Sequence, residues 1–188
     1  MKKASRFILS VLVVLFSNLI FTGVTDAANV AVVPIQIDET KVERAGDFYS
    51  YYWDVMVEKF QFPEFELVDD DKVAKALPED GLKTFDQTSL DGVLKGADAD
   101  IVVAMRLDEV VEKTDIVIEG EPMTDCRMSG EFVSYNKVTG KFFRKKFNYH
   151  DRMEEVLTLK TDWQQHAFAS NLRRFISRTM DGMKPNKY

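Results

Sequence analysis

The chain has 188 residues, of which 45% are hydrophobic and 12% aromatic, and its formal net charge at pH 7 is −6. An acidic chain repels phosphate backbones, so this charge argues against a nucleic-acid-binding protein. The single cysteine, Cys126, excludes an intramolecular disulfide, and the fold must therefore depend on packing. This thiol could pair with another chain, although a lone cysteine in a strand is typically a small buried residue.

The first residues have the pattern of a cleavable export signal. Lys2, Lys3 and Arg6 precede an apolar stretch at 7–21, and small residues follow up to Ala27. This order of charged, apolar and small residues predicts cleavage after Ala27. The alternative is a retained membrane anchor, but the apolar stretch is shorter than the ~20 residues of a spanning helix.

We therefore expect a signal peptide at 1–27 and a single α/β domain at 28–188. The mature protein is expected to be periplasmic or secreted, with no stable membrane span. No cysteine lies near the cleavage point, so we do not expect a lipoprotein.

The first half of the mature chain alternates predicted strands and helices. Residues 29–37 (NVAVVPIQI) predict a first strand, with an edge or a bend at Pro34. Residues 45–60 predict a helix, and 65–68 predict a short strand. The apolar face expected for this helix consists of Phe48, Tyr49, Tyr52, Trp53, Met56 and Phe60.

Two short helices are expected next. The first covers 72–77 and is capped by Asp69 or Asp70, because a carboxylate at a helix start accepts free backbone N–H groups. The second covers 90–95 and is capped by Ser89.

The second half predicts long strands that are followed by a helix. A central strand starts at 101 and continues to 111 or 118; a turn at 120–122 leads to a strand at 123–135. A hairpin loop at 136–140 leads to a returning strand at 141–152. The last helix is expected to be capped by Thr161 or Asp162 and closed by Gly182 and Pro185.

The predicted element order is β-α-β-α-α-β-β-β-α. Strands joined through helices should be parallel, and strands joined by tight turns should be antiparallel. The fold class is therefore α/β (α+β), a mixed parallel/antiparallel sheet packed with helices, the first and the last of them lying on the sheet.

Three segments resemble a group of bacterial envelope proteins. They are 29–37, the run FELVDDDKVAKAL at 65–77 and the run GADADIVVAMRL at 96–107. The order of these segments is similar to the α/β domain shared by the TolB N-terminus, CsgG and LpoB. The resemblance implies a TolB N-terminal-domain-like fold and a non-catalytic domain that docks on other envelope components. This chain lacks the lipid-attachment cysteine of many members.

The sequence offers no convincing catalytic or metal site. His150 and His166 lie on different predicted elements and lack the local spacing of zinc ligands. By strand alternation, Cys126 points inward and His150 outward, so they cannot form a nucleophile–base pair. Three consecutive residues at 69–71 cannot wrap one cation. We therefore predict that the protein is not an enzyme and binds no cofactor.

Two groups of residues are candidates for partner binding. Tyr49, Tyr51 and Trp53 span more than one helix face, and we expect Tyr51 to be exposed together with either Tyr49 or Trp53, unless the helix is buried all round. Arg144 and Lys146 belong to a basic run that could contact an acidic partner or anionic lipid, or could protect an edge strand from aggregation.

The residues thus favour an extracytoplasmic binding or assembly domain that docks on a cell-envelope protein or on itself. The alternative is a periplasmic small-ligand binding protein, which would need an apolar pocket lined by Phe and Met from the long strands.

The export signal gives a first testable prediction. Mass spectrometry of the protein purified from an envelope or secreted fraction should find Ala28 as the mature N-terminus. A chain that retains residues 1–27 would contradict the predicted export as a soluble domain.

Overall fold

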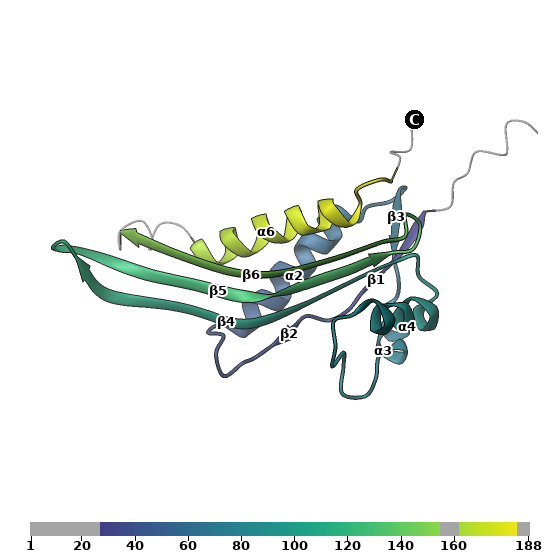
Figure 1. The fold of residues 1–188 in the computed structure, drawn as a ribbon, viewed down its shortest axis with the longest axis horizontal. Coiled ribbons are helices and arrows are strands. Elements are labelled where there is room, and N and C mark those ends of the chain that lie inside the picture. The colour runs from purple at the N-terminus through teal and green to yellow at the C-terminus, as the bar shows by residue number, and fades with distance from the viewer. Residues whose placement is uncertain (1–26, 155–161, 184–188) are drawn as a thin grey trace, which may run out of the picture.

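The computed structural model describes residues 27–154 and 162–183 (Figure 1). The predicted signal peptide and Pro185 lie outside this part. The strands of the described residues are β1 (Ala28–Val32), β2 (Gln36–Ile37), β3 (Phe65–Leu67), β4 (Ile101–Ile118), β5 (Glu121–Asn136) and β6 (Lys141–Glu154). The helices are α2 (Ala45–Lys59), α3 (Asp70–Ala76), α4 (Gln87–Ala97) and α6 (Trp163–Thr179).

The six strands form one mixed sheet in the order β3-β1-β4-β5-β6, with β2 also paired to β4. β1 is parallel to β3 and β4, whereas β5 is antiparallel to β4 and β6. The predicted fold class and both strand orientations are therefore confirmed. The predicted first strand is divided into β1 and β2 around Pro34, as expected for a residue that cannot donate to the ladder.

One face of the sheet, which we name the inner face, is covered by α2 and α6 (Figure 1). The two helices pack on alternate residues of the long strands and form the larger hydrophobic core. Phe48 of α2 meets Phe168 of α6 edge-on, with ring centroids 5.2 Å apart. Phe175 of α6 packs on Phe132 of β5 at 5.5 Å. The expected packing of the first and last helices on the sheet is confirmed.

The opposite, outer face is covered only at one end, by α3 and α4 (Figure 1). There the sheet presents small or branched apolar residues, including Val102, Ala104 and Val133, which are fully buried. Further along the same face, β4 presents Arg106, and β5 presents Glu131. The face thus changes from apolar to charged where the two helices end.

Several element boundaries differ from those predicted. α4 starts at Gln87, and its cap is Asp86, whose Oδ1 accepts a hydrogen bond from the Ser89 backbone N–H at 2.8 Å; the predicted cap by Ser89 is wrong. The Asp86 carboxylate accepts a hydrogen bond from the backbone N–H of Ser89, which would otherwise have no partner in the first turn of the helix. α3 starts at Asp70 rather than 72, and the predicted cap by Asp69 is confirmed.

The turn between β4 and β5 also differs from the prediction. It is made by Glu119 and Gly120, both of which have positive φ, and Pro122 lies inside β5. The predicted hairpin is confirmed, but its loop covers 137–140, because Asn136 still belongs to β5 and pairs with Lys141. β6 consequently extends back along β5 to Glu154.

Gly130 marks a close approach between β5 and its neighbours. A Cβ atom at this position would lie 2.3 Å from the carbonyl oxygen of Arg106 and 2.7 Å from the Phe147 ring. The β4–β5 register shifts beside this position, between Leu107 and Glu109. Glycine is thus required here by lack of space, next to a bulge.

This contact gives a stability prediction. Gly130→Ala should lower the free energy of unfolding by about 1–3 kcal/mol, because the methyl group overpacks against backbone. Gly92→Ala, in α4 where nothing lies within 4 Å of the added Cβ, should be neutral or stabilising. Urea unfolding followed by circular dichroism measures both, and equal stability of the two variants would contradict the tight contact.

Candidate docking surfaces

An exposed apolar stripe runs along α2. Tyr49, Trp53 and Val57 are separated by four residues and therefore share one side of the helix. Their exposed fractions are 42%, 40% and 44%, whereas Phe48 and Met56 on the same helix are fully buried. We name Tyr49, Trp53 and Val57 the α2 stripe.

The α2 stripe lies on the flank of the helix that faces away from α6. The other flank faces α6, because Tyr51 Oη donates to Asp162 at 3.3 Å and Glu58 pairs with Arg173 at 2.7 Å. Tyr52 points into the core, where its hydroxyl donates to the Val33 carbonyl at 3.0 Å. Two sides of α2, the flank facing α6 and the core side, thus have assigned neighbours within the described chain.

The structure corrects two expectations about these aromatic residues. Tyr49 and Trp53 are both exposed and do not belong to the buried face, which instead includes Val55. Tyr51 is half-buried against Phe48, with ring centroids 5.8 Å apart, rather than exposed. These differences arise because α6 packs against one flank of α2. The helical periodicity of residues 45–60 does not show which flank that is.

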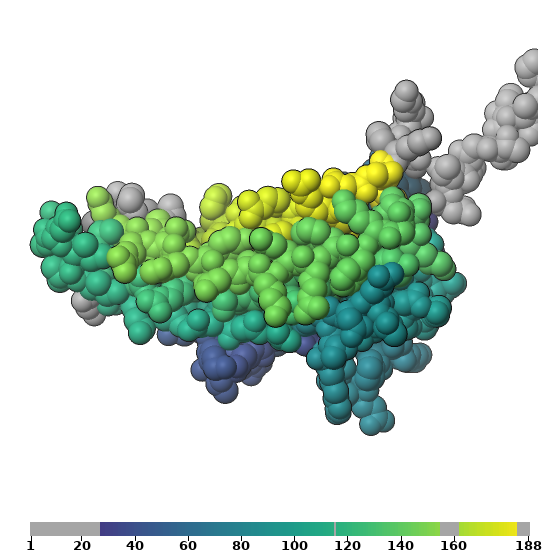
Figure 2. Space-filling model, in the orientation of Figure 1, coloured from purple at the N-terminus to yellow at the C-terminus, as the bar shows by residue number. Residues whose placement is uncertain are grey.

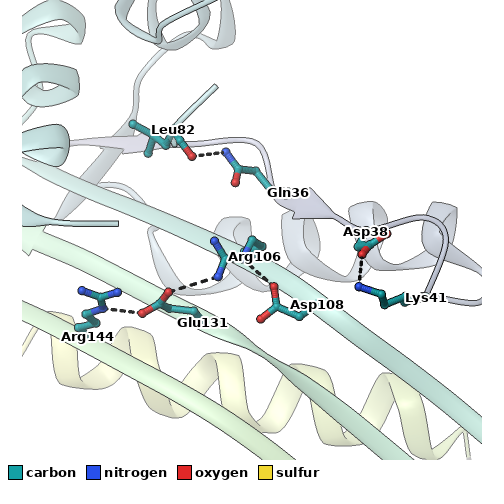
Figure 3. A network of polar contacts seen from close by, with 8 residues as sticks. All are labelled: Gln36, Asp38, Lys41, Leu82, Arg106, Asp108, Glu131 and Arg144. Carbon is teal, nitrogen blue, oxygen red and sulfur yellow. Dashed lines mark hydrogen bonds and ion pairs between the residues drawn. The ribbon is translucent and has the colours of Figure 1, made fainter. Parts of the chain in front are cut away.

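The second candidate surface is the uncovered part of the outer face, on β4, β5 and β6. Glu131 lies at its centre, and its side chain is only 3% exposed. Arg144 Nε donates to Glu131 Oε1 at 2.5 Å, and Arg106 Nη2 lies 3.6 Å from Oε2 (Figure 3). Arg106 Nε also binds Asp108 at 2.6 Å. The carboxylate of Glu131 is therefore held beneath the side chains of two arginines.

A similar arrangement surrounds Asp125, further along β5. His150 Nε2 lies 2.5 Å from Asp125 Oδ1, Arg127 Nε donates to Oδ2 at 2.8 Å, and Arg152 Nε lies 3.5 Å from Oδ1. The hydrogen bond from His150, together with the charge of Arg127, holds the pKa of Asp125 below its usual range. We name the residues around both carboxylates the cationic face, which consists of Arg106, Arg127, Arg144, Lys146, His150 and Arg152.

The candidates Arg144 and Lys146 and the predicted outward-pointing His150 lie on this face, whereas Arg106, Arg127 and Arg152 were not singled out from the sequence. The side chains of Asp125 and Glu131 point to the same face, and arginine side chains cover them. The hairpin loop that precedes Lys141 sets the register between β5 and β6. Counting back from the Asn136–Lys141 pair places Asp125 opposite Arg152 and Glu131 opposite Lys146.

The surroundings of Cys126 oppose nucleophilic chemistry. Cys126 is fully buried on the inner face, and its neighbours across the sheet are Glu112 on β4 and Asp151 on β6. Burial, together with these carboxylates, raises the pKa of the Cys126 thiol to about 12. His150 binds Asp125 on the outer face, so the predicted separation of Cys126 and His150 on opposite faces is confirmed.

Two hollows of about 540 and 560 Å³ open on the surface. The first lies beside the start of α6 and is lined by Met153, Trp163 and His166, among others; the second lies between the β1–β2 link and the α3–α4 loop. The Phe and Met lining that the ligand-binding alternative predicts is present in neither, apart from Met153. Within residues 27–154 and 162–183, no three His, Cys, Asp or Glu side chains are grouped to hold a metal ion.

In the space-filling view, β5 and β6 form the front of the molecule, with α6 above them and α3 and α4 at the right-hand end (Figure 2). None of the helices in the described part of the chain is long and apolar enough to cross a membrane.

Comparisons with known proteins give only distant likenesses. No protein-family model matches the sequence, and no curated protein matches it. Similar solved structures include the LpoB C-terminal domain from Salmonella enterica, with 14% identity, a TM-score of 0.40 and coverage of 74% of this chain and 91% of that one. A lipoprotein from Neisseria meningitidis is similar at 11% identity and a TM-score of 0.43, covering 81% of this chain and 99% of that one. LpoB is one of the proteins named in the sequence resemblance.

Cys126 gives a prediction about chemical reactivity. A thiol-specific reagent such as a disulfide-exchange dye should label the folded protein far more slowly than the protein in concentrated guanidinium chloride, because the native thiol is buried and protonated. Labelling of the folded protein at the rate of the unfolded chain would show that Cys126 is accessible.

Proposed function

We propose that this protein is a non-catalytic binding domain of the cell envelope, which docks on another envelope protein through the α2 stripe. The single observation that supports this proposal is the exposure of Tyr49, Trp53 and Val57 in one row. Large aromatic residues lose little conformational entropy on binding and bury a large apolar area, so they are frequent anchors of protein interfaces.

The neighbours of the stripe support a docking role. α2 is fixed in place by Phe48, Tyr52 and Met56 on its buried side and by the Glu58–Arg173 pair on the flank facing α6. The stripe is thus displayed by a rigid helix, and binding would not require the helix to become ordered. The export signal at 1–27 supports a location outside the cytoplasm.

The chemistry of the described residues supports a non-catalytic role. The Cys126 thiol is protonated at neutral pH and is separated from His150 by the sheet, so His150 cannot act as its general base. The hydrogen bond from His150 and the charge of Arg127 lower the pKa of Asp125, which favours its charged form and opposes a role as general acid.

Site-specific photo-crosslinking in the producing cells tests the proposed surface. A photo-reactive amino acid at position 53 should give a discrete adduct with another envelope protein, and the same amino acid at Val138 should not. Val138 is a suitable control because it is 59% exposed and lies in the β5–β6 turn.

The Tyr49→Ser variant, with the probe still at position 53, should reduce this adduct at least about tenfold, since a buried aromatic anchor contributes 2 kcal/mol or more. Its thermal unfolding should match that of the parent protein because Tyr49 is exposed. If the adduct at position 53 contains only two copies of this chain, the α2 stripe serves self-association rather than docking on another envelope protein. Adducts of equal yield at 53 and 138 would remove the stripe as the docking surface.

A further inference from the structure

The cationic face presents positive charge even though it contains carboxylates. The side chains of Asp125 and Glu131 are each 3% exposed, whereas those of Arg127, Arg144 and Arg152 are 48%, 45% and 57% exposed. A partner that approaches this face therefore meets guanidinium groups first, and the carboxylates lie underneath.

The buried carboxylates also hold the arginines in position. Arg127 and Arg144 each donate through Nε, and Arg152 directs its Nε toward Asp125. The hydrogen bonds of Arg127 and Arg144 to these carboxylates are thus made by Nε and not by the terminal Nη atoms. An arginine bound through Nε has lost part of its rotamer freedom, while its Nη groups can still bind a second carboxylate.

The spacing of these cations matches an extended peptide. Arg144, Lys146, His150 and Arg152 are alternate residues of β6, with Asn148 between them, so neighbours on this row lie about 6.8 Å apart. β6 is the last strand in the sheet order, and no strand of the described chain pairs with its outer edge. An added strand would hydrogen-bond to this edge and place alternate side chains opposite the cationic row.

The sign of the charges selects among the candidates for that strand. Pairing of β6 with β6 of a second copy would place positive charges opposite each other, which is how charged edge strands oppose aggregation. A strand with alternating Asp or Glu would find a carboxylate partner at each position instead. An anionic membrane is disfavoured, because the chain as a whole carries a net charge of −6.

We propose that the outer edge of β6 binds an extended acidic segment of a protein partner, whose alternate carboxylates pair with the cationic face. This site is separate from the α2 stripe, which lies on the other side of the sheet, and it does not depend on the proposed docking of that stripe. The structure thus assigns two functions to the charges of β6, namely rejection of a second β6 and acceptance of an acidic strand.

A peptide titration tests the proposal with the mature chain. The probe is a fluorescein-labelled synthetic peptide of alternating Glu and Thr that is as long as β6. The comparison peptides are an isomer with all Glu in one block and a peptide of alternating Lys and Thr. Fluorescence anisotropy should show binding of the alternating Glu peptide that weakens with added salt, with the block isomer at least about fivefold weaker.

Charge reversal at a single position provides the matched control. Lys146→Glu removes an exposed cation and breaks no ion pair of the described residues, so it should not unfold the protein; it should weaken binding at least about fivefold. Lys72→Glu makes the same change on exposed α3 and should leave the affinity unaltered. Amide NMR signals of β6 should shift when the alternating peptide is added, since the proposal places it on that strand.

Three results would overturn the proposal. They are equal affinity for the block isomer, equal weakening by Lys72→Glu and Lys146→Glu, and binding to phosphatidylglycerol vesicles that exceeds binding to the peptide and is lost in Lys146→Glu. Tyr49→Ser separates this site from the α2 stripe, because it should reduce the adduct formed from the probe at position 53 and leave the peptide affinity unchanged.

Discussion

The antiparallel pairing of β4 with β5 is the interaction on which the rest of the structure depends. It continues from Ile101–Asn136 at one end to Ile118–Glu121 at the other, and β6 extends along most of β5. α2 and α6 cover the inner face of this long ladder, but α3 and α4 cover only one end of the outer face. A sheet that is longer than its outer helix layer must present two different surfaces on one face, because uncovered apolar side chains would remain in water.

This constraint explains the position of the charged residues. Val102 and Ala104 of β4 lie under the helices, and the next residue of β4 on the same face is Arg106. The carboxylates of Asp125 and Glu131 do not remain free in solvent but are bound by arginine and histidine. The same sheet therefore provides a packed core on one side and a fixed pattern of charge on the other, while α2 presents its apolar stripe above the inner face.

Most of the fold was predictable from local signals, whereas much of the candidate surface was not. Strand alternation, Pro34 and the 136–140 loop identified the strands, their orientations and the opposite placement of Cys126 and His150. The exposure of Tyr49 and Trp53 could not be obtained in this way, because it depends on which flank of α2 faces α6, a contact between distant parts of the chain. The burial of Glu131 likewise requires Arg106 from β4 and Arg144 from β6, and only the three-strand register brings these residues together. The helix caps were predictable only in part, since the cap of α3 by Asp69 was identified correctly but the cap of α4 by Asp86 was not.

The unequal covering of the outer face can be measured directly by NMR with a soluble paramagnetic cosolute. Val102 and Val111 are on the same face of β4, but Val102 lies beneath the helices, and Val111 lies in the uncovered part opposite Arg127. The structure predicts strong broadening of the Val111 methyl signals and little broadening of those of Val102. Equal broadening of the two residues would contradict the account, because α3 and α4 would then not divide the face into a packed and an open part.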